Sequence, residues 1–272
     1  MKSIDHYRHY GWPVYAIALL TAMFLIVPTF LVLPLSFNAD PFFTYPMRGL
    51  SLQWYVEVLT SPRWTGAIFN SAMVGLASAA IGTVIGTLAA VGLWLNPPRT
   101  RQLLLAFLLS PLVIPAVVFA AGFFYLAFRV NLSNSLIGLV WAHVVLGLPF
   151  VVVVVSASLE QFDPTLVRAA KSLGAGNGMI FRRVMLPIIA PGVITGAIFA
   201  FVTSWDEIVV SLFMISSSDR YTLPRVLWGG LREHLSPALI ALATLLTLLS
   251  LALMFAVERL RGSVHARGVA RR

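Results

Sequence analysis

The sequence predicts an all-α, polytopic membrane protein, and three observations indicate this fold class. The 272 residues are 59% hydrophobic and only 11% charged, whereas soluble domains carry roughly 25% charged residues. The apolar residues gather in six runs without Lys or Arg, each long enough to cross a bilayer core of about 30 Å as a helix. Lys and Arg concentrate in the segments between alternate runs, which is typical of a membrane protein with a fixed orientation.

The six runs predict six transmembrane helices in one domain. They cover residues 14–36, 67–95, 103–128, 136–159, 188–215 and 235–257. The first run follows Lys2 and Arg8, as the apolar part of a signal peptide would. Its length and the lack of a small-residue cleavage site before Asn38 predict a retained helix instead.

Prolines inside the runs predict bends. Pro111 and Pro115 lie in the third run and Pro149 lies in the fourth, and a proline inside a helix removes a backbone hydrogen bond and kinks it. His143, also in the fourth run, is interpreted as a packed or interfacial histidine.

The distribution of basic residues predicts the orientation. Six runs place both termini on one side of the membrane. The Lys and Arg residues expected on the other side are Arg48, Arg63, Arg129, Arg220, Arg225 and Arg232. All others fall on the terminal side, so the positive-inside rule places the termini, the polar segment 163–187 and the basic tail 258–272 in the cytoplasm. The tail can touch anionic lipid. This asymmetry explains the pI of about 10.6 without a nucleic-acid partner.

The polar segment 163–187 predicts two short helices around a glycine. Asp163 and Pro164 form a helix start, because Asp is a good N-cap and proline loses nothing at the first helical position. Gly174 ends this helix, since glycine readily adopts the left-handed backbone of a C-terminal cap. The expected apolar stripe consists of Leu166, Ala169 or Ala170, and Leu173.

A second short helix follows through Ile180, Phe181 and Val184, and Pro187 is expected to end it. The two helices and the glycine would form a compact cytoplasmic knob. An amphipathic hairpin that lies on lipid headgroups is the alternative interpretation.

The segment resembles the EAA loop of ABC importer permeases. The matching positions are Arg168, Ala169, Ala170, Gly174, Val184, Met185, Leu186 and Pro187. Arg168 stands where the family usually has Glu, and Val184 where it has Ile. The resemblance implies a type I ABC importer permease fold, in which this loop docks into a groove of a separate ATPase. The coupling residues implied are Arg168, Ala169, Ala170, Leu173, Gly174, Leu186 and Pro187.

Asp206 and Glu207 interrupt the fifth run. A carboxylate in the membrane costs about 2.5–3.5 kcal/mol on insertion scales, so both are expected to face protein or water. Thr203, Glu207 and Ser211 follow at i, i+4 and i+8, and Trp205 lies beside them. Carboxylates next to an aromatic face suit an ammonium ligand through charge pairing and cation–π attraction. Structural pairing with a basic residue of another helix or partner is the alternative, although the uncharged runs themselves contain no Lys or Arg.

Residues 204–211 resemble the Asp-Asp-Val-Val segment of spermidine/putrescine importer permeases. Further similar stretches are 27–38, 142–153 and 236–244, and the best match is to the C-type subunit of that family. Glu207 replaces the second Asp, and Trp205 replaces a smaller apolar residue. The resemblance implies that the substrate path carries polyamine cations past Thr203, Trp205, Asp206, Glu207 and Ser211.

The expected function is therefore the permease subunit of an ABC importer in the bacterial inner membrane. The chain has no Gly-x-x-x-x-Gly-Lys-Ser/Thr loop, so ATP and Mg²⁺ are expected on a partner ATPase dimer. We expect no enzymatic activity, cofactor or metal on this chain. The further partners implied are an extracytoplasmic solute-binding protein and a second permease subunit, a different but homologous chain.

Three alternatives remain open from the sequence. An ABC permease for another small solute would share the same loop. An ion-coupled secondary transporter is compatible with the carboxylate pair, but no inverted repeat is evident. An intramembrane enzyme would need a metal-binding or nucleophile–base constellation, and none stands out.

Overall fold

The computed structural model describes residues 12–41, 46–47, 49–233 and 236–248. The chain divides into two compact units, Pro62–Gly229 and the combination of Met1–Ser61 with Gly230–Arg272. All labelled elements of the described residues are helical.

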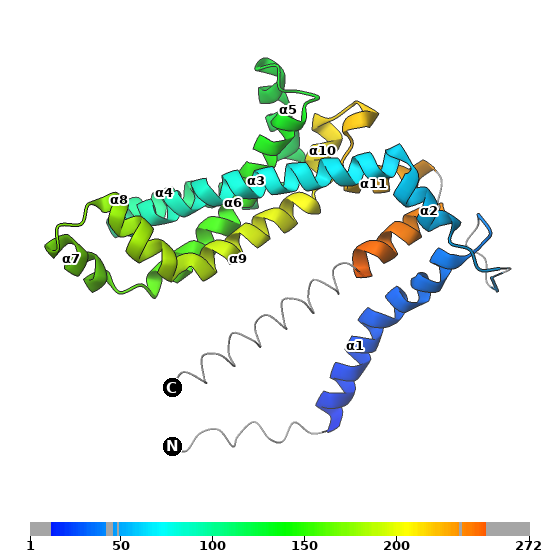
Figure 1. Cartoon of the computed structure of the whole chain (residues 1–272), viewed down its shortest axis with the longest axis horizontal. Coiled ribbons are helices and arrows are strands. Elements are labelled where there is room, and N and C mark those ends of the chain that lie inside the picture. The colour runs from blue at the N-terminus through cyan, green and yellow to red at the C-terminus, as the bar shows by residue number, and fades with distance from the viewer. Residues whose placement is uncertain (1–11, 42–45, 48, 234–235, 249–272) are drawn as a thin grey trace. The chain divides into compact units, whose positions relative to one another are not determined.

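Three long helices form the centre of the larger unit. They are α3 (Pro62–Leu95), α6 (Leu136–Glu160) and α9 (Leu186–Trp205), and each packs against the other two (Figure 1). All three belong to helices that are long and apolar enough to cross a membrane. Small side chains let them approach closely, as where Gly147 of α6 lies against Ala200 of α9.

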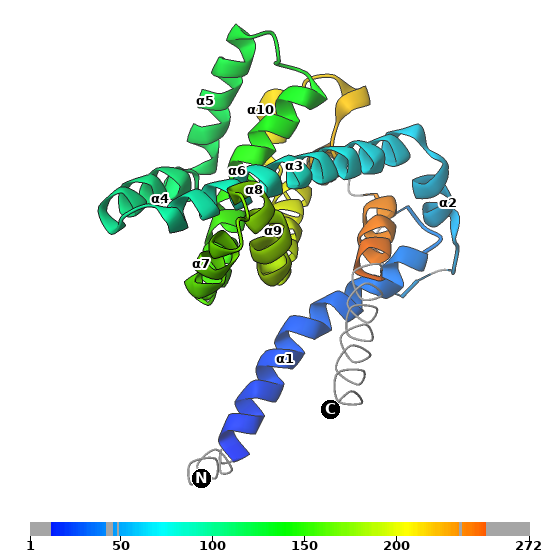
Figure 2. The ribbon, with the colours of Figure 1, turned by 60° about the vertical axis from the view of Figure 1, so that its left-hand side comes forward.

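The third predicted run is not one straight helix. It consists of α4 (Pro98–Val113) and α5 (Ala116–Arg129), which are bent by 103° at the break between them. Ile114 and Pro115 have extended backbones there, because proline disfavours the helical conformation of the residue before it. Figure 2 shows α4 and α5 diverging at this point. Pro149, in contrast, lies inside an uninterrupted α6.

The prediction that Pro187 ends a short helix is wrong. One continuous helix runs from Asn177 to Trp205, through α8 (Asn177–Ile180), a π-helical turn η3 (Phe181–Met185) and α9. In the π turn the Leu186 N–H bonds to the Phe181 carbonyl, one residue farther back than in an α-helix. Such a turn just before Pro187 accommodates a residue that lacks an N–H, so the helix continues.

The segment after α10 (Val209–Met214) is tied down by two asparagines. Asn70 of α3 donates from Nδ2 to the carbonyls of Asp219 (3.0 Å) and Tyr221 (3.1 Å). Asn134, between α5 and α6, accepts at Oδ1 from the N–H groups of Ser216 (3.0 Å) and Ser217 (3.1 Å). The short helix η4 (Ser218–Arg220) is therefore fixed at both ends before α11 (Leu223–Glu233) begins.

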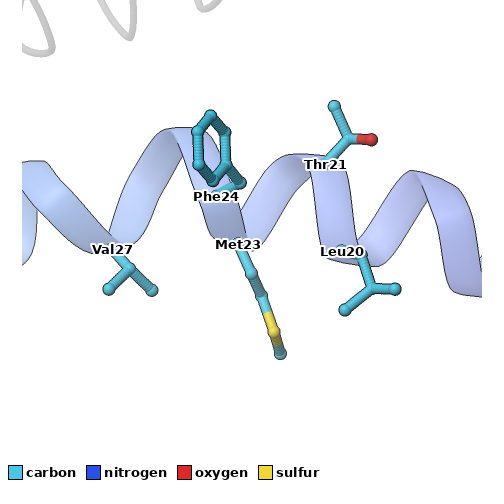
Figure 3. Close-up of a pocket in the computed structure, with 5 residues that line it drawn as sticks. All are labelled: Leu20, Thr21, Met23, Phe24 and Val27. Atoms are coloured by element: carbon cyan, nitrogen blue, oxygen red, sulfur yellow. The ribbon is translucent and has the colours of Figure 1, made fainter.

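The smaller unit contains α1 (Trp12–Val32), η2 (Leu33–Phe37), α2 (Gln53–Thr60) and a helix over Pro237–Leu248. A hydrogen bond of 2.6 Å between the hydroxyls of Ser36 and Tyr55 joins η2 to α2. An open, mostly apolar hollow on α1 is lined by Leu20, Thr21, Met23, Phe24 and Val27, whose side chains are drawn in Figure 3. All five come from one helix, so the hollow is a gap between neighbouring side chains.

The predicted runs correspond to these helices as follows. Runs 67–95 and 136–159 lie in α3 and α6, run 14–36 lies in α1 and η2, and run 188–215 covers α9, a break and α10. Of run 235–257 the structure describes only residues up to 248, and the tail 258–272 lies outside the described residues.

Candidate functional sites

The segment from Asp163 begins with a well-formed helix cap. Asp163 Oδ1 accepts the backbone N–H of Thr165 at 2.8 Å, and Oδ2 accepts the Thr165 hydroxyl at 2.6 Å. These bonds, the hydroxyl's first, stabilise the ionised carboxylate and hold the pKa of Asp163 below its usual value. The Asp-Pro start predicted from sequence therefore opens α7 (Pro164–Ser172) as expected.

Gly174 ends α7 in a left-handed conformation, with a φ of 80°. The N–H of Ala175 bonds to the Ala170 carbonyl at 3.0 Å, and the N–H of Gly174 bonds to the Lys171 carbonyl at 2.9 Å. This 6→1 and 5→2 pair is the Schellman motif, which satisfies the last carbonyls of a helix and turns the chain sharply. The predicted role of Gly174 as a helix stop is confirmed.

The apolar stripe of α7 points away from the core. Leu173 is 89% exposed and Leu166 is 41% exposed, whereas Val167 and Ala170 pack against the buried cluster that includes Ile180. Arg168 and Ala169 are exposed, as is Pro187, while Leu186 is half-buried. The sequence pattern identified the stripe but not its direction, because periodicity alone does not say which face meets a neighbour.

The second site is the break between α9 and α10, at the other end of the helix bundle from α7 and α8 (Figure 1). Glu207 lies in this break and folds back onto α10. Its Oε1 accepts the N–H of Val210 at 2.7 Å, and its Oε2 accepts the N–H of Ser211 at 3.1 Å. Asp206 differs from Glu207: it is exposed, and its carboxylate forms no hydrogen bond or ion pair with the residues that the structure describes, while its N–H bonds to the Val202 carbonyl.

His143 of α6 meets Glu207 at this break. Its Nε2 lies 3.5 Å from Glu207 Oε2, and its Nδ1 lies 2.6 Å from the Ser204 hydroxyl. The ring is 1% exposed. Sequence reasoning missed this contact because the search for a partner considered only Lys and Arg. The available signal was a histidine inside an otherwise uncharged run, which needs polar partners when it is buried.

Arg225 reaches the same region from α11. Its Nη1 donates to the carbonyl of Ser211 at 3.0 Å, and its guanidinium lies 4.2 Å from the centre of the Tyr221 ring. The sequence placed Arg225 in an outer segment and gave it no role. The structure brings its guanidinium to the carbonyl of Ser211, the residue whose N–H is bound by Glu207.

The other predicted path residues do not form one continuous strip. Thr203 is half-buried and its hydroxyl donates to the Phe199 carbonyl at 2.8 Å. Trp205 stacks on Phe201 with ring centres 5.5 Å apart, and Ser211 is fully buried. The i, i+4, i+8 spacing requires an unbroken helix, and the helix is interrupted after Trp205.

Comparison with known proteins identifies the family. A family model described as "Binding-protein-dependent transport system inner membrane component" matches residues 82–265, more than half of the chain. The chain belongs to this family. It is therefore an inner-membrane transport component, and membership implies an ATPase, a binding protein and a second permease as partners.

Individual relatives cover most of the chain. The spermidine/putrescine transport system permease protein PotC of Haemophilus influenzae is 31% identical over 231 residues, which is 85% of this chain and 89% of that protein. The putrescine transport system permease protein PotI of Escherichia coli is 31% identical over 239 residues, which is 85% of this chain and 84% of that protein.

A solved structure shows the same fold. The crystal structure of a bacterial ABC transporter involved in the import of the acidic polysaccharide alginate contains a chain that matches with a TM-score of 0.73 and 14% identity. The match covers 90% of this chain and 94% of that chain. This transport component therefore has the all-α fold of ABC importer permeases, as the EAA-like segment implied.

Proposed function

We propose that this permease subunit moves polyamine-like cations into the cytoplasm as part of an ABC importer. The observation that carries the proposal is the 31% identity to the H. influenzae PotC protein over 85% of the chain. The chemistry at the α9–α10 break is compatible with a cationic substrate, because the break offers the exposed carboxylate of Asp206, and the aromatic residue Trp205 precedes it in the sequence.

The substrate path in this proposal runs past the break. Asp206 contacts the ammonium group, with Trp205 and Thr203 on the preceding turn of α9. Glu207 and Ser211 line the path from behind, where their polar groups bond to each other and to the start of α10. An exposed acid at this position suits a cation and repels an anion such as sulfate or phosphate.

The segment 163–187 is proposed to couple transport to ATP hydrolysis. The exposed apolar side chains Leu166 and Leu173, on a short helix that is capped at both ends, support a docking role. A separate ATPase dimer binds ATP and Mg²⁺ and receives α7, with Arg168, Ala169 and Gly174 at the contact. Ala170 packs against the core behind them, and Leu186 and Pro187, on the following helix, complete the proposed coupling residues.

The remaining partners follow from the same assembly. Both termini and segment 163–187 lie in the cytoplasm, in agreement with the basic residues on that side. A solute-binding protein delivers the substrate at the opposite face, and a second permease, a different homologous chain, completes the path. This chain itself catalyses no reaction.

The test is uptake by the complete assembly in proteoliposomes that contain ATP. We expect uptake of labelled putrescine or spermidine that vanadate blocks and that ionophores leave unchanged, and competition by other polyamines but not by sulfate. Asp206→Asn should reduce uptake about tenfold or more, since a hydrogen-bonded charge pair contributes about 1.5–3 kcal/mol. Uptake that collapses with an ionophore at constant ATP would instead identify an ion-coupled secondary transporter. ATP-driven uptake of another solute alone would overturn the polyamine assignment.

A further inference from the structure

We propose that His143 is a positioning residue that holds Glu207 in the α9–α10 break, so that the two acidic residues have separate roles. Glu207 fixes the geometry of the break, and Asp206 alone is left to meet a cation. The assignment of Asp206 to the substrate rests on the proposed function. The role of His143 and Glu207 in shaping the break does not.

The Glu207 carboxylate is already occupied by the protein. Oε1 accepts the N–H of Val210 and Oε2 accepts the N–H of Ser211, the positions whose N–H groups have no partner at the start of a helix. Oε2 also lies near the Ser211 hydroxyl at 3.5 Å and His143 Nε2 at 3.5 Å. A substrate ammonium that bound Glu207 would have to break these bonds, whereas the carboxylate of Asp206 has no such bond to another described residue.

His143 spans the break from the neighbouring helix. Through Nδ1 it contacts Ser204, on the last turn of α9, and through Nε2 it contacts Glu207, beyond the end of α9. The ring is 1% exposed and Ser204 is 7% exposed, so water does not replace either contact easily. The imidazole on α6 therefore fixes the end of α9 relative to Glu207, whose carboxylate binds the first N–H groups of α10.

Arg225 supports the same arrangement from the other side. It donates to the carbonyl of Ser211 in the first turn of α10, whose N–H is bound by Glu207. The guanidinium of Arg225 thus binds the carbonyl of Ser211, and the carboxylate of Glu207 binds the N–H of the same residue. Arg225 and Glu207 therefore both fix the backbone of Ser211, and with it the first turn of α10.

The two contacts of His143 can be separated by substitution. A glutamine amide reaches the place of Nε2 and keeps the contact to Glu207, whereas an asparagine amide reaches only the place of Nδ1 and keeps the contact to Ser204. His143→Leu fills the space and keeps neither. If His143 only packs, Gln, Asn and Leu should behave alike in transport and differ only in stability.

The break can be followed without any substrate. The chain has no cysteine, so spin labels can be placed on Val202→Cys of α9 and Leu212→Cys of α10, both exposed positions at 52% and 36%. Ten residues of unbroken helix would separate them by roughly 15 Å. The distance distribution across the break is measured in the assembled transporter for each His143 variant, alongside polyamine uptake.

We expect H143Q to retain the narrow distance distribution of the parent and uptake within about twofold. H143N and H143L should broaden the distribution and lower uptake about tenfold, as loss of a buried charged contact implies. Ser204→Ala removes only the contact that H143Q also lacks, so the distribution should stay narrow. Glu207→Ala removes the other contact, should broaden the distribution and serves as a second variant if H143N is not recovered with the ATPase.

The outcomes separate the two proposals. Equal distance distributions and equal uptake in H143Q, H143N and H143L would overturn the positioning role and leave the proposed function intact. A parent assembly that takes up no polyamine, with distributions that still differ between H143Q and H143N, would overturn the proposed function and support the positioning role. Loss of uptake in Asp206→Asn with an unchanged distribution would confirm that the two acids act separately.

Discussion

Replacement of Gly174 by valine should uncouple transport from ATP hydrolysis. Gly174 has a φ of 80°, and a Cβ built on it meets no atom within 4 Å. The substitution therefore costs no packing energy, and its whole effect lies in the backbone. An L-residue in the left-handed region costs about 1–2 kcal/mol, and a β-branched side chain is especially unfavourable there. That energy changes the population of the turn about 5- to 30-fold.

The turn is formed by the hydrogen bonds from Ala175 to Ala170 and from Gly174 to Lys171. When the turn opens, the exposed Leu173 loses its fixed position, and docking on the ATPase weakens. We expect the G174V assembly to insert normally and to hydrolyse ATP, with uptake reduced about 5-fold or more, following the shift in the turn.

The matched control is Gly176→Val in the same segment. Gly176 also has open space around it, but its φ of −71° suits any residue. Gly174→Asn is the second control, because asparagine tolerates the left-handed region better than other residues. Uptake and ATPase rates are measured on purified assemblies in proteoliposomes. Equal uptake in G174V and G176V would refute the argument that the left-handed turn positions the docking surface.

Three further predictions concern the larger unit. Gly192→Ala should destabilise the α6–α9 contact by about 1–3 kcal/mol, because its Cβ would meet the Ser158 side chain at 2.0 and 2.8 Å, and the midpoint of thermal unfolding in detergent should fall. Gly122→Ala, inside α5 and in open space, should leave the midpoint unchanged or raise it, since alanine favours a helix more than glycine. Asn134→Ala removes the acceptor for two backbone N–H groups in an exposed to half-buried position, where a hydrogen bond contributes about 0.5–1.5 kcal/mol, so proteolysis between residues 215 and 222 should become faster. Arg101→Gln breaks an exposed ion pair with α6 and should change the unfolding midpoint little, since such pairs contribute about 0–1 kcal/mol.

The features that could be predicted from the sequence depend on local chemistry. Asp163 with Pro164 marks a helix start, and Gly174 marks a helix end, because each residue acts on the backbone within a few positions. Both were found where expected. The apolar runs located α3 and α6 almost to their last residues, since burial in lipid requires uninterrupted apolar sequence.

The features that were missed depend on neighbours far away in the chain. Pro187 is a helix breaker by local rules, yet the π turn before it and the packing of Ile189 against the core keep the helix intact. His143 and Glu207 are separated by 64 positions in the sequence, and nothing in either run specifies that their side chains meet in space. The outward direction of Leu173 is likewise set by which face of α7 meets Ile180.

The two candidate sites share one rigid element, and this bears on how they communicate. The helix Asn177–Trp205 has 29 residues and a length of about 43 Å. It begins beside the Gly174 turn and ends at the Glu207 break, so under the proposed coupling role of segment 163–187 a displacement of that segment should tilt the whole helix as a unit. Beyond the break, Glu207 binds the N–H groups at the start of α10, and Arg225 links α10 to α11 through the Ser211 carbonyl.

Motion of the helix should therefore concentrate at residues 206–208, where α9 and α10 have no shared backbone ladder. The spin-label pair on Val202 and Leu212 lies on either side of that point. Its distance should differ between ATP-free and vanadate-trapped assemblies, whereas a pair within α9, on Ile194 and Val202, should not change. If the distances of both pairs change equally, α9 bends along its whole length. The break at Glu207 would then not be the hinge between segment 163–187 and the Asp206 site.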